Sequence, residues 1–183
     1  MEATHQSLKR FRDDQALVSI RRDGCDDRKI QAFVIHFSDT LVLLQYIYDF
    51  HVDGILLLRI SDITSIETTA TDEFQKQLLI EEGEFAKIDF EYRPPIGSYD
   101  VFLHSLPETE IIILEDEAAD DPEFFIGRLI AVDGDEVSVR FFSGAANWED
   151  EPSVIEVGRI TSCQTKTNYI NFYARHFARS NAQ

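Results

Sequence analysis

Two clusters of acidic residues have the side chains that a divalent cation prefers. The first cluster is Asp23, Asp26 and Asp27, and the second is Asp133, Asp135 and Glu136. Carboxylate oxygens are the usual protein ligands of calcium and magnesium. Neither cluster has the spacing of a calcium-binding loop, and acidic residues are common in tight turns. We interpret both clusters as turn residues and expect no metal ion and no other cofactor.

No other residue pattern predicts catalysis. The histidines are His5, His36, His51, His104 and His176. They are scattered, and none has the HxH or HExxH spacing of a zinc site. The phosphate-binding patterns GxxxxGK[ST] and GxGxxG and the nucleophile pattern GxSxG are absent from the sequence. Cys163 lies in a predicted strand, where a cysteine is usually a small buried apolar group. We therefore assign no catalytic residue.

One loop has the composition of a protein interface. Trp148 is the only tryptophan, and Glu149, Asp150 and Glu151 follow it directly. An aromatic anchor beside acidic residues is typical of a surface that binds a basic partner. These four residues are therefore the candidate partner-binding residues. The alternative is that Trp148 folds back to cover the mouth of a barrel, and we favour it because single tryptophans are usually well buried.

The overall charge limits the class of partner. The 183 residues include 34 Asp and Glu but only 17 Lys and Arg, which gives a net charge of −17. A surface this acidic repels phosphate backbones, so nucleic-acid binding is disfavoured. Solubility alone would also explain the charge. The hydrophobic content of 44% supplies a packed core, so the chain is expected to be globular.

The remaining composition favours the cytoplasm. The two cysteines, Cys25 and Cys163, lie in regions that do not correspond, which fits unpaired thiols in a reducing compartment. The first residues are polar and lack the hydrophobic core of a secretion signal. No apolar run approaches the roughly 18–20 residues of a membrane helix. We expect a cytoplasmic protein that does not interact with a membrane.

The elements that position these residues are arranged around the stretch Phe124 to Phe142. Apolar residues alternate with polar ones on both sides of Asp133-Gly134, which is a favoured tight-turn pair. The pattern predicts a β-hairpin. A similar hairpin is predicted over residues 30–48. Short helices are predicted over residues 7–14 and 99–106, and two further helices are expected to begin near Thr71 and Asn168.

The two halves of the sequence follow the same order of predicted elements. Each has a short helix, a strand, a hairpin, two more strands and a helix. Val42, Leu44 and Tyr46 correspond to residues 137, 139 and 141, and residues 63–65 correspond to residues 160–162. We infer a tandem repeat. Its parts are a first repeat over residues 1–83, a linker over 84–97 with a candidate extra strand over 85–92, and a second repeat over 98–183.

Five short strands in each repeat suit a strongly bent sheet that closes into a small barrel, because closure removes exposed edges. The predicted fold class is therefore mainly β with short helices. It consists of two tandem five-stranded barrels of the SH3-like or Sm-like kind, each followed by a helix.

The second repeat resembles the Sm-like small barrel. The matching positions are Phe125, Gly127, Leu129 and Asp133, followed by Ile155 and Ile160 in a later strand pair. The asparagine that binds RNA in that family is absent here, since residues 134–136 are Gly, Asp and Glu. The resemblance thus implies the fold and not RNA binding. The whole chain is similar to uncharacterised bacterial proteins with paired small barrels and a tyrosine-bearing final helix, a similarity that implies no activity.

Three functions remain open at this stage. The first is a non-enzymatic acidic module that acts through contacts with a protein partner. The second is an immunity-type inhibitor whose acidic residues neutralise a basic partner such as a nuclease toxin. The third is a metal-dependent enzyme that uses acidic loops. The partner, the oligomeric state and the orientation of the two barrels do not follow from the sequence.

Overall fold

The hairpin predicted over Phe124 to Phe142 is present. The computed structural model describes residues 2–180, and in it β7 (Glu123–Asp133) pairs antiparallel with β8 (Glu136–Phe141). Asp133 pairs with Glu136, and Gly134 adopts a φ of +59° in the turn between them. Glycine takes this left-handed conformation without a steric cost. The local prediction of strand, turn and strand is therefore confirmed.

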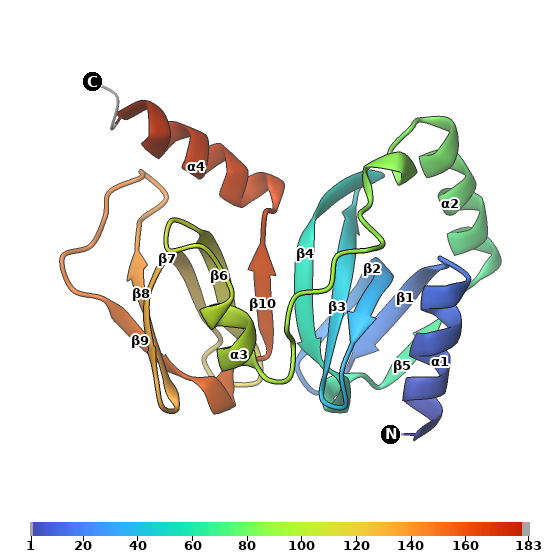
Figure 1. Cartoon of the computed structure of the whole chain (residues 1–183), viewed down its shortest axis with the longest axis horizontal. Helices are drawn as coiled ribbons and strands as arrows, with labels where there is room; N and C mark the ends of the chain where they lie inside the picture. The colour runs from blue at the N-terminus through green and yellow to red at the C-terminus, as the bar shows by residue number, and fades with distance from the viewer. Residues whose placement is uncertain (1, 181–183) are drawn as a thin grey trace.

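The expectation of two separate closed barrels is wrong. All ten strands belong to one antiparallel sheet with the order β5-β1-β2-β3-β4-β10-β6-β7-β8-β9. The sheet is continuous because β4 (His51–Arg59) pairs with β10 (Ser162–Thr165), which also pairs with β6 (Ile111–Asp116). This pairing satisfies backbone groups that two isolated five-stranded sheets would leave exposed at their edges. The product is an open sheet and not two barrels (Figure 1).

The other elements complete the same arrangement. The remaining strands are β1 (Leu17–Arg22), β2 (Asp26–Phe37), β3 (Leu41–Tyr48), β5 (Ser65–Glu67) and β9 (Ser153–Glu156). The α-helices are α1 (Glu2–Asp13), α2 (Ala70–Glu81), α3 (Tyr99–His104) and α4 (Asn168–Ser180). The short 3₁₀ helices are η1 (Ile60–Asp62), η2 (Phe85–Lys87) and η3 (Val157–Arg159). The strand order β5-β1-β2-β3-β4 in the first half corresponds to β10-β6-β7-β8-β9 in the second.

The linker does not form the candidate extra strand. Residues 85–92 contain η2 and turns, and no strand forms between residues 84 and 97. The alternating apolar residues of this segment pack instead against the core of the sheet. Phe85 and Phe90 contact Phe33, with ring centroids 5.5 and 5.9 Å apart. Hydrophobic burial therefore explains the alternation that suggested a strand.

The core covers both faces of the sheet. On one face, Leu57, Cys163 and Leu114 are neighbours across β4, β10 and β6, and they belong to a cluster that includes Phe102 of α3 and Leu79 of α2. The buried thiol of Cys163 is therefore part of the packed core, as predicted, and burial raises its pKa. Two further clusters lie elsewhere. One packs α1 against the first half, and the other packs α4 against the second.

The junction between the halves is also held by a side chain. Tyr99 is buried, and its hydroxyl lies 3.3 Å from the carbonyl oxygen of Leu57 in β4 and 3.1 Å from that of Thr161 beside β10. Burial raises the pKa of this hydroxyl well above 10.0, so it stays protonated and able to donate. Helix α3 thus contacts both strands of the junction.

Helix α2 begins at a buried capping box. The cap is Thr69, two residues before the predicted Thr71, and its side chain accepts a hydrogen bond from the Asp72 amide. The Asp72 carboxylate accepts from the Thr69 amide at 2.9 Å and from the Ser19 hydroxyl and the Gln31 amide, each at 2.8 Å. Burial favours a higher pKa, but these hydrogen bonds outweigh it and hold the pKa of Asp72 below 3.8. The carboxylate joins α2 to β1 and β2.

An Asp72→Asn variant is expected to lose about 2 kcal/mol of unfolding free energy at neutral pH, because buried hydrogen bonds to a charged acceptor are lost. The native pKa is below the unfolded value, so the stabilising effect is complete above the unfolded pKa and disappears as the pH falls through the native pKa. Urea unfolding at neutral pH and at about pH 3 should therefore show a smaller difference in acid. Glu73→Gln, in the same helical turn but exposed, is the control. An equal difference at both pH values would contradict this role for Asp72.

Candidate functional site

A cleft lies on one face of the sheet over the junction of the two halves. Leu56, Gln164 and Ile113 are neighbours in one row across β4, β10 and β6, so their side chains lie on the same face. Leu56 belongs to the cluster covered by α1, and Ile113 belongs to the cluster covered by α4. Neither helix covers the strip between them. The resulting cleft has a volume of about 750 Å³ and includes residues from both halves.

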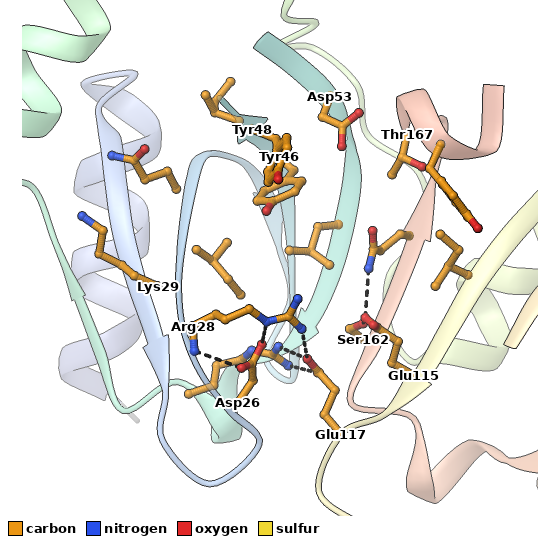
Figure 2. Close-up of a pocket in the computed structure, with 18 of the residues that line it drawn as sticks. Asp26, Arg28, Lys29, Tyr46, Tyr48, Asp53, Glu115, Glu117, Ser162 and Thr167 are labelled. Atoms are coloured by element: carbon orange, nitrogen blue, oxygen red, sulfur yellow. Dashed lines mark hydrogen bonds and ion pairs between the residues drawn. The ribbon is translucent and has the colours of Figure 1, made fainter. Parts of the chain in front are cut away.

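Glu115 is held in a fixed orientation on one wall of the cleft. It lies on β6 and pairs with Ser162 of β10 on one side and with Phe124 of β7 on the other. Its Oε2 atom accepts hydrogen bonds from the Ser162 hydroxyl at 2.5 Å and from the Gln164 side-chain amide at 2.9 Å. No donor in residues 2–180 bonds to its Oε1 atom. Figure 2 shows Glu115 and Ser162 together on this wall.

A buried ion pair closes one end of the cleft. Arg22, at the end of β1, has only 3% of its side chain exposed and contacts both carboxylate oxygens of Glu117, at 2.7 and 2.8 Å. Glu117 also accepts a hydrogen bond from the Thr161 hydroxyl at 2.9 Å. Burial favours a lower pKa for Arg22, but the hydrogen bond and the negative charge of Glu117 raise it. This pair joins the first half to the second, since its two residues are 95 positions apart.

A second, exposed arginine lies near this pair. Arg28 of β2 donates to Asp26 at 2.5 Å and lies 3.7 Å from Glu117. Burial alone would raise the pKa of Asp26, but the hydrogen bonds and charge of Arg28 hold it below its usual value. Lys29 follows on the same strand, and Figure 2 places Arg28 and Lys29 across the cleft from Glu115. The β2 wall therefore carries both signs of charge, and Arg28 extends from it toward Glu117.

Aromatic side chains surround the opening of the cleft. Tyr48, Phe124 and Tyr169 line it, although 64%, 47% and 51% of their respective surfaces are exposed. Tyr46 lies deeper, and burial raises its pKa. Exposed aromatic residues around a cavity are common in binding sites, where their burial by a ligand supplies much of the affinity.

The lining of the cleft favours a positively charged ligand. Five carboxylates and three cationic side chains line it, and two of the cations, Arg22 and Arg28, are engaged with Glu117 and Asp26. None of the histidines lines the cleft. No group of three or more His, Cys, Asp or Glu residues within residues 2–180 is placed to hold a metal ion. The geometry therefore supports recognition of a cation by carboxylate and aromatic groups.

The four residues predicted to bind a partner lie outside this cleft. Trp148 is partly buried, and its ring packs against Phe142 and Phe177 with centroid distances of 5.2 and 4.5 Å. Arg128 and Arg140 lie over the same indole at 5.4 and 5.6 Å. Glu149, Asp150 and Glu151 are exposed in the loop that follows. Trp148 covers the core beneath α4, and the three acids follow it in the exposed loop before β9.

The sequence interpretation missed the residues that form the cleft. The sequence patterns assign no role to Glu115, Ser162 or Gln164. Polar residues at positions of β6 and β10 where a buried apolar residue is expected are the signal that could have identified the site. That signal becomes interpretable only when the pairing of β6 with β10 is known.

No family model, curated protein or solved structure matches this chain. Among residues 2–180, no helix is both long enough and apolar enough to cross a membrane. The grounds for a functional proposal are therefore the fold and the geometry of the cleft.

Proposed function

We propose that this protein is a non-enzymatic interaction module that binds a basic protein partner at the cleft over the β4–β10 junction. The main support is the combination of exposed aromatic residues with an excess of carboxylates in this cleft. A chain with a net charge of −17 also attracts cationic proteins over a long range and accelerates their association.

A narrower form of this function is inhibition of a nucleic-acid-binding enzyme such as a nuclease toxin. The acidic loop between β6 and β7 supports it. Glu117 and Phe124 line the cleft, and the exposed Asp120 and Asp121 lie between them in the sequence. This loop therefore extends the negative charge of the cleft to the surface. A surface rich in carboxylates is complementary to a protein groove that normally binds phosphates.

Affinity capture from extracts of the cells that produce the protein tests the proposal. We expect a captured protein rich in Lys and Arg at low salt that is largely lost near 1 M salt, where the Debye length is only about 3 Å. Replacing Asp120 and Asp121 with Asn should weaken capture, because they are exposed in the loop that connects two lining residues of the cleft, Glu117 and Phe124. Replacing Asp133 and Asp135 with Asn is the matched control, since it removes the same charge at the opposite end of β7.

The two variants separate the possible outcomes. A basic protein that is purified, binds the wild-type chain directly and binds the Asp120/Asp121 variant more weakly than the control supports the proposal. Equal loss in both variants would show a general charge effect and would contradict the cleft as the binding site. Captured proteins that resist high salt or carry no excess of basic residues would contradict a basic partner.

A further inference from the structure

Within residues 2–180, three carboxylates that line the cleft form no ion pair, namely Asp49, Asp53 and Glu115, and Glu115 is the one held by two side-chain donors. It is half-buried and lines the cleft, but no Lys, Arg or His in residues 2–180 forms an ion pair with it. Its neighbours Glu117 and Asp26 both pair with arginines. Removing a carboxylate from water is costly unless a cation or several donors compensate. Glu115 keeps part of its surface in water, so a cation in direct contact with it would add an ion pair that the described residues do not supply.

The hydrogen bonds of Glu115 determine which atom would receive that cation. Ser162 and Gln164 both donate to Oε2, so they fix the orientation of the carboxylate. The Oε1 atom is left for a ligand. An acceptor fixed in advance by its own protein loses little side-chain entropy on binding, which increases the affinity available to a small cation.

An aromatic ring lies next to this carboxylate. Phe124 is directly opposite Glu115 in the β6–β7 ladder, where side chains are about 5 Å apart at their Cβ atoms. Nearly half of its surface is exposed. A cation that contacts Glu115 would therefore also lie against the face or edge of this ring. Cations interact favourably with an aromatic face within about 6 Å of its centre.

We propose that the cleft binds the guanidinium group of an arginine from the partner protein, with Glu115 Oε1 as its acceptor and Phe124 as its aromatic contact. This inference rests on the proposed function. Arginine is favoured over lysine because the planar guanidinium donates hydrogen bonds in its own plane while its face packs on an aromatic ring. Leu56 and Ile113 form the apolar floor along which the methylenes of the arginine pack.

The positive charges in the cleft are compatible with this ligand. Arg22 is buried in its pair with Glu117, and Arg28 pairs with Asp26, lies 3.7 Å from Glu117 and acts on Glu115 through its charge without forming an ion pair with it. Lys29 lies on the β2 wall, across the cleft from Glu115 (Figure 2). A bound guanidinium would contact Glu115 on the β6 wall, opposite Lys29. The lining contains more carboxylates than cations, which favours the entry of a positively charged group.

The test uses a blocked arginine, Nα-acetyl-arginine methylamide, as the probe and titrates it into the whole protein while amide chemical shifts are recorded by NMR. The uncharged isostere Nα-acetyl-citrulline methylamide is the ligand control. We expect saturable shifts at Glu115, Phe124 and Gln164 with the arginine probe, and affinity lower by roughly tenfold or more with the citrulline probe, because a charge-assisted hydrogen bond is lost.

Two variants identify the residue that recognises the charge. Glu115→Gln keeps the shape of the side chain and should weaken binding of the arginine probe by roughly tenfold or more. Glu156→Gln removes the same charge from an exposed position on β9 and should leave the affinity unchanged. Phe124→Ala should weaken the arginine probe by a few fold and leave the weak citrulline binding nearly unchanged.

The result can overturn this inference without overturning the proposed function. Equal affinities for the two probes, or an unchanged affinity in Glu115→Gln, would exclude Glu115 as the arginine acceptor. A basic partner that still requires Asp120 and Asp121 would then leave the broader proposal standing. If the arginine probe binds as expected and no basic partner is captured, the cleft recognises arginine and the interaction-module proposal fails.

Discussion

Replacing Arg22 with methionine is expected to lower the free energy of unfolding by about 3–5 kcal/mol. Arg22 is almost fully buried and contacts both oxygens of the mostly buried Glu117. Methionine keeps much of the side-chain volume but leaves the Glu117 carboxylate without its main cation. An uncompensated charge of this kind costs far more than the loss of an exposed ion pair. Urea unfolding of the purified variant measures the change.

Two further variants test the explanation. Arg28→Met removes an arginine whose side chain is 75% exposed, so its cost should stay below about 1 kcal/mol. The double variant Arg22→Met/Glu117→Leu should regain most of the lost stability, because the isolated carboxylate is gone. If the loss in the double variant equals the sum of the losses in Arg22→Met and Glu117→Leu measured separately, the pair is not coupled and the loss has another cause.

Replacing Gly54 with alanine is expected to cost about 3 kcal/mol or more. Gly54 lies in β4 opposite the end of β10, and an added Cβ atom would lie 2.6 Å from the carbonyl oxygen of Thr165 and 2.6 Å from the amide nitrogen of Thr167. Both atoms belong to the backbone, so the strain can be relieved only if the two strands move apart. The variant should therefore loosen the junction of the two halves as well as lower the unfolding free energy.

Hydrogen exchange identifies where the strain acts. Relative to the wild-type protein, Gly54→Ala should accelerate amide exchange in β4 and β10. Exchange in β7 and β8, which lie farther along the sheet, should change less. Gly24→Ala is the control, since a Cβ at Gly24 meets no atom within 4 Å. A Gly54→Ala protein with normal stability and normal exchange at residues 55–58 would contradict the close approach seen at this position.

The local structure was predictable because it depends on neighbouring residues. Asp133-Gly134 between alternating apolar runs predicts the β7–β8 hairpin from turn chemistry alone. The correspondence of Val42 and Leu44 with residues 137 and 139 places β3 and β8 at the same position in the strand order of each half. The pairing of β4 with β10 has no such local signal. β4 has an apolar run over residues 55–58, but β10 has only four residues and is mostly polar, so nothing in its sequence indicates which strand it pairs with.

The candidate site could not be predicted for a related reason. Trp148 stands out in the sequence because it is unique and followed by acids, yet its ring covers the core beneath α4. Glu115 is unremarkable in the sequence because it is one of 34 acidic residues. Its position becomes distinctive only when Ser162, 47 residues later, is placed beside it. A site formed by the pairing of distant strands depends on tertiary contacts that composition and periodicity do not encode.

The continuous sheet makes binding and the integrity of the junction interdependent. A ligand in the cleft would contact residues from both sides of the β4–β10 junction, and Tyr99 bonds to the carbonyl groups of Leu57 in β4 and of Thr161 directly before β10. A ligand that contacts both halves binds only while the β4–β10 junction is closed. Binding therefore shifts the equilibrium toward the closed junction. A tightly bound partner would therefore add to the β4–β10 ladder and the shared core that already join the two halves.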